Sequence, residues 1–227
     1  MQKLKEKLAS MESHIASLQH QSRSEDVANS IIHGIGVALS IAALVLLVVF
    51  GSINGTSWHV VSFSIFGATL IFLYLSSTLF HGLKNERLVK FFRLFDYSGI
   101  FLLIAGTYTP ITLILMRNGW GWSLFGIVWG LALSGIILRF VFPKKIELLL
   151  SVLYVIMGWI ILIAAKPMFE ILPAGFIIWL LIGGASYMLG LVFLSWKKLP
   201  FHHAIWHLFV LGGSTAHFFG ILFHLAR

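Results

Sequence analysis

The chain has 227 residues, of which 59% are hydrophobic and only 11% are charged, and its formal net charge is +8. Soluble domains are about half apolar and about a quarter charged, so this composition excludes an ordinary water-exposed surface, and it equally excludes disorder. The lack of cysteine excludes disulfides, thiolate metal sites and a cysteine nucleophile.

The N-terminal segment, residues 1–26, is polar and has neither the apolar core nor the cleavage site of a signal peptide. Ser22 and Glu25 are spaced as a capping box for the helix that follows. Apolar residues recur at spacings of four and three, which predicts an amphipathic cytoplasmic helix. We favour a helix resting on the inner leaflet over a self-association coil, because the pattern is too short for a stable coil. These apolar residues are Leu4, Leu8, Met11, Ile15 and Leu18.

Seven apolar runs follow, each near the length of about 20 residues that a helix needs to cross a hydrocarbon core of about 30 Å. The breaks between them are too short to hold another domain. The sequence therefore predicts an all-α, polytopic membrane protein in which residues 27–227 form one seven-helix bundle. The runs are Val27–Phe50, His59–Gly82, Phe92–Met116, Gly121–Phe142, Ile146–Ala165, Ile171–Ser195 and His203–Ala226.

The lysines and arginines orient this bundle, because cytoplasmic loops of membrane proteins are enriched in them. Thirteen of the 16 lie on the side of the N-terminus and the even-numbered loops, and the other three are Arg117, Lys166 and Arg227. We therefore expect a multi-pass protein of the cell inner (plasma) membrane, with its N-terminus cytoplasmic and its C-terminus outside. The positive charge is a topology signal, and we expect no nucleic-acid binding.

One depth in the bundle gathers the polar residues that suggest chemistry. Of the eight acidic residues, only Asp96 lies clearly within a span, where a carboxylate costs about 2.5–3.5 kcal/mol at the helix centre. The rise of about 1.5 Å per residue and the alternating helix directions bring Ser77, His81, Asp96, His203 and His207 within roughly 10 Å of one depth.

These residue types suggest a metal centre. His203 and His207 are four residues apart and share a helix face, and His81 adds a third imidazole from another helix. Three histidines with a fourth position open for water is the ligand count of a catalytic zinc site. Zinc is the leading candidate by ligand type, although other divalent ions stay open. Asp96 could orient the metal-bound water and accept its proton, and Ser77 could bond that water or a substrate carbonyl.

Plainer interpretations exist for each of these residues. A histidine near the interface is commonly a polar tip among headgroups, and Ser77 could bond a carbonyl of its own helix. Asp96 could pair with Arg93 or Lys90 at the membrane edge. Of the remaining histidines, we expect His202 to be an interface residue and His217 to hydrogen-bond within the bundle.

Other classes of protein fail on particular residues. A retinal protein needs a lysine in its last helix, and none lies between Leu199 and Arg227. A G-protein-coupled receptor would have the opposite orientation. The sequence also lacks the G-x-S-x-G and H-E-x-x-H motifs of two hydrolase classes.

Three motifs carry a resemblance to the progestin and adipoQ receptor family, and within it most to the bacterial hemolysin III branch. They are Ser77-Thr-Leu-Phe-His81, Phe95-Asp-Tyr-Ser-Gly-Ile100 and His203-Ala-Ile-Trp-His207-Leu-Phe-Val. Asn29 and His33 resemble the first-helix motif of the family, and the resemblance covers the chain from about Glu25 to the C-terminus.

The resemblance implies a seven-helix protein with an inside N-terminus. The related adiponectin receptors and alkaline ceramidases hold zinc with three histidines and a water, assisted by aspartate and serine. Matched motif to motif, His81, His203 and His207 are the ligands, Asp96 partners the water and Ser77 is auxiliary. The family acid three positions before the first-helix asparagine is usually glutamate. Here it is Asp26, to which we assign only a helix-start role.

Three functions remain in view. The first is a zinc-dependent hydrolase of lipid amides or esters, acting in membrane lipid homeostasis. The second is a non-enzymatic membrane-state sensor or homeostasis protein in which zinc is structural. The third, a pore-forming cytolysin, ranks last because the spans lack a polar stripe. Membrane lipids are the expected environment and substrate, and the sequence leaves a homo-oligomer open.

Overall fold

The computed structural model describes residues 22–142 and 147–226, and these residues form helices joined by short connections without a β-strand. The amphipathic helix expected within residues 1–26 lies almost wholly outside the described residues. Seven helices are long and apolar enough to cross a membrane, which confirms the predicted all-α bundle. In chain order the elements are α2 (Arg23–Asn54), α3 (Ser57–Gly82), α4 (Glu86–Pro110) with a π-helical end (Ile111–Leu115), α5 (Gly119–Val141), α6 (Glu147–Trp159), a 3₁₀ turn (Ile160–Ala164), α7 (Ala165–Ile171), α8 (Ala174–Ser195) and α9 (His202–His224).

The start of α2 is fixed by the capping box expected from the sequence. The backbone N–H of Glu25 donates to Ser22 Oγ at 3.3 Å, and the backbone N–H of Ser22 donates to Glu25 Oε2 at 3.4 Å. This reciprocal pair satisfies two donors that a helix start leaves without intrahelical partners. The helix therefore begins at Arg23, four residues before the apolar run.

The fifth span differs from the sequence expectation at its end. The chain around Lys166 was expected to be a break between spans, yet it forms the short helix α7. The preceding 3₁₀ turn ends α6 and starts a new helix, so Pro167 falls in the first turn of α7. A proline is tolerated there because its missing N–H would have no intrahelical partner.

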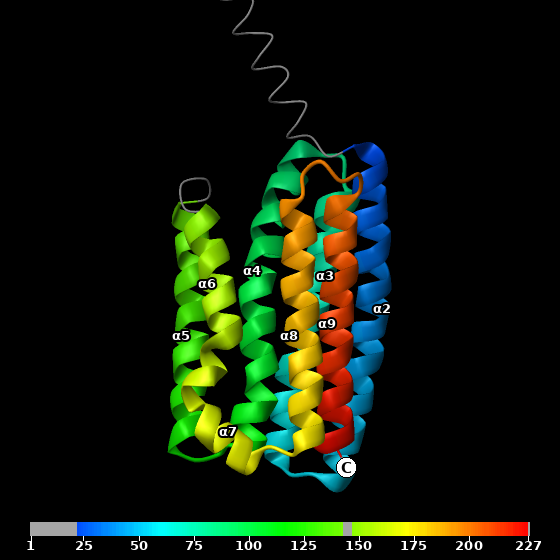
Figure 1. Ribbon diagram of the computed structural model, residues 1–227. Helices are drawn as coiled ribbons and strands as arrows, with labels where there is room; N and C mark the ends of the chain where they lie inside the picture. The colour runs from blue at the N-terminus through cyan, green and yellow to red at the C-terminus, as the bar shows by residue number, and fades with distance from the viewer. Residues whose placement is uncertain (1–21, 143–146, 227) are drawn as a thin grey trace, which may run out of the picture.

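The helices pack as neighbours in the order α2, α3, α4 and α5, while α9 packs against α2 and α8. Figure 1 shows α5 and α6 together at one edge of the bundle, next to α4, and α2 at the opposite edge. The start of α2, the α3–α4 connection and the α8–α9 connection lie at one end, and the C-terminus lies at the other. We call the first of these the α2-start end.

The bundle buries its polar side chains among an apolar core and exposes apolar side chains on its outer faces. Large apolar side chains such as Ile53 and Ile163 are each 71% exposed, whereas Asn29 and Ser77 are fully buried. In lipid a polar group cannot find water, so it is placed between helices. Exposed apolar side chains on the outer faces are consistent with direct contact with lipid tails.

Two glycines allow α2, α3 and α4 to approach closely. A Cβ added at Gly67 on α3 would lie 2.7 Å from the Cβ of Leu44 on α2, and one at Gly99 on α4 would lie 3.0 Å from the Cα of Leu73 on α3. Such small-residue contacts replace the hydrophobic effect, which cannot drive helices together in lipid.

We expect Gly67→Ala to lower the thermal unfolding midpoint of the purified protein, because overpacking a close interface costs about 1–3 kcal/mol. Gly126→Ala is the matched control, since a Cβ at this membrane-span glycine on α5 would meet nothing within 4 Å in the described chain. Equal midpoints for the two variants would contradict this account of the α2–α3 contact.

The orientation expected from the positive charges can be tested on a convenient background, because the chain has no cysteine of its own. Lys166 on α7 and Lys198 in the α8–α9 connection are both exposed, and Figure 1 shows these two segments at opposite ends of the bundle. We expect a membrane-impermeant maleimide to label Lys166→Cys in intact cells and Lys198→Cys only after permeabilisation. The reverse pattern would invert the topology.

Candidate metal centre

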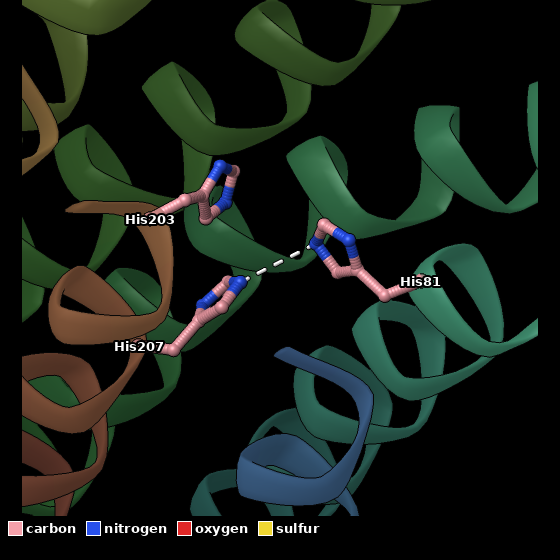
Figure 2. Close-up of side chains that lie close together, drawn as sticks. All are labelled: His81, His203 and His207. Carbon is pink, nitrogen blue, oxygen red and sulfur yellow. Dashed lines mark hydrogen bonds between the residues drawn. The ribbon is translucent and has the colours of Figure 1, made fainter. Parts of the chain in front are cut away.

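Three histidine side chains meet at the α2-start end of the bundle. His81 lies at the end of α3, and His203 and His207 lie one turn apart at the start of α9. One nitrogen from each ring lies within 4.8 Å of the others. Figure 2 shows the three rings pointing toward one another from the two helices. The structure thus brings together all three residues that the sequence assigned as metal ligands.

The start of α9 places two of these rings. Phe201, just before the helix, has φ 57° and ψ 23°, which is the left-handed region. A non-glycine residue rarely adopts this conformation, which costs about 1–2 kcal/mol. It follows Pro200, whose ring prevents a simple helical continuation from the preceding turn. The abrupt reversal lets α9 begin at His202, so that His203 and His207 fall in its first two turns and face α3.

The spacing of the His81 and His207 rings fits a metal ion. Nε2 of His207 lies 3.3 Å from Nε2 of His81. Two imidazole nitrogens bound to one tetrahedral ion at 2.0–2.1 Å would be about 3.3–3.4 Å apart. Nδ1 of His207 is buried and has no hydrogen-bond partner among the described residues. The three side chains could therefore hold a metal ion.

The Asp96 carboxyl lies beside this cluster. Asp96 is buried on α4, and its interacting neighbours are His81, Ser77 and Arg139. The cation near Asp96 is therefore Arg139 on α5, which the sequence analysis did not consider, rather than a lysine or arginine of its own helix. The Arg139 guanidinium also lies 3.8 Å over the Tyr97 ring.

Ser77 lies one turn before His81 on α3 and is fully buried. Its hydroxyl does not bond a carbonyl of its own helix, and its polar neighbour is the Asp96 carboxyl on α4. By contrast, Ser98 Oγ donates to the carbonyl oxygen of Leu94 at 2.7 Å. The Ser77 hydroxyl is therefore left to the Asp96 carboxyl.

Helix α2 contributes residues whose role the sequence analysis missed. Asp26 Oδ1 lies 3.0 Å from Nδ1 of His81, and Asn29 Nδ2 lies 3.4 Å from the same nitrogen. The buried ring of His33 packs against that of His207, with centroids 3.8 Å apart. Residues 26, 29 and 33 share one helix face, so helical spacing was the signal that could have joined Asp26 to the motif residues. Asp26 does lie at the helix start, as assigned, but it also contacts His81.

Two further histidines with roles expected from the sequence, His202 and His217, lie outside the cluster. His202 lies at the start of α9, with Nδ1 3.8 Å from a carboxylate oxygen of Glu25. His217, deeper in α9, has Nε2 3.4 Å from the carbonyl oxygen of Leu180, which confirms its expected hydrogen bond within the bundle. Neither nitrogen points into the histidine cluster.

A cavity of about 1410 Å³ adjoins the cluster. His81, Asp96, His203 and His207 all contribute to its lining, and it follows α9 as far as His217. That distance along the helix is about 20 Å. Most of its remaining wall is apolar and comes from α4, α6, the 3₁₀ turn and α8, including Leu103, Ile104, Leu150, Ile161, Leu180 and Leu191. The polar cluster therefore sits at the mouth of a long apolar chamber.

Comparisons with known proteins agree with this architecture. The protein named Hemolysin-3 homolog from Bacillus subtilis (strain 168) is 48% identical over 204 residues, which is 89% of this chain and 95% of that protein. Hemolysin-3 from Bacillus cereus is 47% identical over 201 residues, covering 88% and 92%. The human Monocyte to macrophage differentiation factor is 28% identical over 209 residues, covering 89% and 85%. No solved structure matches the chain.

The family described as Haemolysin-III related matches residues 21–218, which includes every residue of the histidine cluster and its neighbours. The human relative links this family to the progestin and adipoQ receptor type. With seven apolar helices, the chain is a multi-pass membrane protein, and it belongs to the Haemolysin-III related family.

Proposed function

We propose that this protein hydrolyses amide or ester bonds of membrane lipids, with zinc held by His81, His203 and His207, and that it thereby serves membrane lipid homeostasis. The observation that carries this proposal is that three features of the structure lie together. A three-imidazole group, a buried carboxyl and an apolar chamber of about 1410 Å³ share a common lining. Ligand pockets for small molecules are commonly 300–1,000 Å³, so this chamber is large enough for lipid chains.

The choice of zinc rests on ligand chemistry. Three neutral imidazoles without a thiolate suit zinc, and three protein ligands leave a position for water or substrate. When bound, zinc lowers the pKa of water to about 7 and polarises a carbonyl oxygen.

The side chains around the histidines have separate roles in this proposal. Asp96 orients the attacking water and accepts its proton, because its buried carboxyl neighbours His81 and lines the chamber. Ser77 has an auxiliary role, because its hydroxyl neighbours the Asp96 carboxyl and orients it. Arg139 counterbalances the Asp96 charge from α5. The apolar walls hold the lipid chains and limit access of bulk water.

The expected topology decides which lipids can reach the site. If the α2-start end is cytoplasmic, the mouth of the chamber lies at the level of the inner leaflet. The substrate would then be a lipid of that leaflet, with its amide or ester bond near the headgroup boundary and its chains in the apolar chamber.

A second candidate function is a membrane-state sensor with structural zinc. The observation in its favour is that the ligands come from two helices only, α3 and α9, so a metal ion would lock these helices together. Pore formation ranks third. The names of the two Bacillus relatives suggest it, but most buried ionisable side chains of the described residues, such as His81, Asp96 and His207, lie in the α2-start half of their helices.

Metal content is the first measurement. We expect elemental analysis of the purified protein to give about one zinc per chain, and His207→Ala to lose it, because two imidazoles rarely retain a tightly bound ion. His202→Ala is the matched control and should keep its zinc, since His202 faces Glu25. Absence of metal from the wild type, even after zinc is supplied, would remove the hydrolase proposal.

The role of Asp96 requires a product assay. Wild-type protein in liposomes of mixed amide and ester lipids should release fatty acid, detected by mass spectrometry. Asp96→Ala should keep zinc and lose about 10²–10⁴-fold in turnover, the usual range for a general base. Ser98→Ala, two residues away on the same helix, should leave turnover unchanged, because Ser98 bonds its own helix.

The result also separates the candidate functions. Equal turnover in Asp96→Ala and wild type would remove Asp96 from the chemistry. Zinc without any lipid product, together with a lower unfolding temperature after chelation, would favour the sensor. Dye release from vesicles at stoichiometric protein would instead favour the pore.

A further inference from the structure

The two ring nitrogens of His81 face different partners. Nδ1 lies 3.0 Å from Oδ1 of Asp26 on α2, and Nε2 lies 3.3 Å from Nε2 of His207 on α9. The His81 side chain is only 1% exposed, whereas that of Asp26 is 41% exposed. Asp26 therefore reaches from the aqueous end of the bundle to a buried ring, where little water competes for the contact.

This contact decides where the His81 ring carries its hydrogen. A carboxylate can only accept hydrogen bonds, so Nδ1 of His81 must be the donor. The amide nitrogen of Asn29 lies farther away, at 3.4 Å, and carries no charge. The shorter, charge-assisted bond to Asp26 therefore outweighs it. With the hydrogen on Nδ1, a neutral ring has its lone pair on Nε2, which faces His207.

We propose that Asp26 is a positioning residue of the metal centre, which fixes the tautomer and orientation of His81 so that Nε2 is ready to bind the ion. This inference rests on the zinc centre of the proposed function but not on lipid hydrolysis. A carboxylate that accepts a hydrogen bond from the second ring nitrogen of a metal-binding histidine also makes that histidine a better ligand.

The local structure of α2 places Asp26 for this role. The capping box formed by Ser22 and Glu25 sets the first turn of the helix. Asp26 then falls on the face that carries Asn29 and His33. His33 packs on the ring of His207, so this one face of α2 contacts a candidate ligand from each of the two helices.

The simpler interpretation is that Asp26 only stabilises the start of α2, where negative charge is favourable. Glu25 provides the matched comparison, because it has the same charge one position earlier. Glu25 faces the Ser22 backbone and His202, not the histidine cluster. Glu25→Gln keeps the capping geometry, since glutamine also serves at that position of a capping box.

The test is a zinc affinity measurement on the full-length protein, by competition with a chromophoric chelator. We expect Asp26→Asn to weaken zinc binding by about 10–100-fold, the usual effect of removing such a partner. Asp26→Glu should restore most of the affinity by returning the carboxylate. Glu25→Gln should bind zinc as the wild type does.

A second readout distinguishes positioning from a structural role. In cobalt-loaded protein, Asp26→Asn should shift the visible absorption bands of the ion, while the unfolding temperature of the metal-free protein stays close to that of the wild type. Lower metal-free stability with unchanged bands would overturn the inference, as would wild-type zinc affinity in Asp26→Asn or an equal loss in Glu25→Gln.

The outcomes for this inference and for the proposed function can be told apart. A wild type that binds no zinc removes both. Zinc binding that is weakened in Asp26→Asn, without lipid hydrolysis by the wild type, supports the role of Asp26 and removes only the hydrolase. Lipid hydrolysis by the wild type, with equal zinc affinity in the wild type and Asp26→Asn, supports the hydrolase and removes the role of Asp26.

Discussion

A polar side chain in the middle of a bilayer has no water to bind, and this constraint organises the whole bundle. Each such group must find a partner between helices or pay a desolvation penalty of several kcal/mol. Here five polar side chains are buried in the α2-start half of their helices: Asn29, His33, His81, Asp96 and His207. The outer faces are left to apolar side chains. The candidate centre is thus the place where the bundle concentrates the polarity that lipid cannot accept.

The same constraint explains how α9 is joined to α3. Apolar side chains give little orientation in lipid, because the tails are as apolar as the helices. Hydrogen bonds do give orientation: the Tyr74 hydroxyl on α3 donates to Ser214 Oγ on α9 at 2.8 Å, and Tyr187 on α8 lies 3.0 Å from the same oxygen. The contact between His81 and His207 is a further polar link between α3 and α9, nearer the helix ends. Together the two links fix the rotation of α9, and hence the direction of His203.

Much of the fold followed from residue patterns because membrane helices are set by local features. The length of each apolar run and the capping box at Ser22 and Glu25 depend only on nearby sequence, and both predictions were confirmed. The histidine cluster was also predictable, because helix direction and the rise per residue fix depth. The short helix α7 was not, since a polar, proline-containing stretch resembles a break unless the preceding 3₁₀ turn is known.

The depth of each residue along its helix could be predicted from the sequence, but the rotation of each helix about its own axis could not. Arg139 and Asp96 lie on different helices, and only the packing of α5 against α4 brings the guanidinium near the carboxyl. The contact of Asp26 with His81 likewise depends on which face of α2 meets α3. Both are long-range contacts between residues that, taken singly, suit simpler roles at a membrane edge or a helix start.

Catalytic and structural roles for a metal ion in this centre are compatible, because both follow from the same three ligands. Structural zinc contributes about 10–16 kcal/mol to the folding of small zinc-finger peptides, so an ion shared by α3 and α9 would hold those helices firmly. What distinguishes a catalytic centre is access to the remaining position. In this bundle His81, His203 and His207 line the same chamber as Asp96, and that chamber continues between apolar walls to His217. A purely structural centre has no need of such a chamber, and its presence is the reason to place lipid chemistry before sensing.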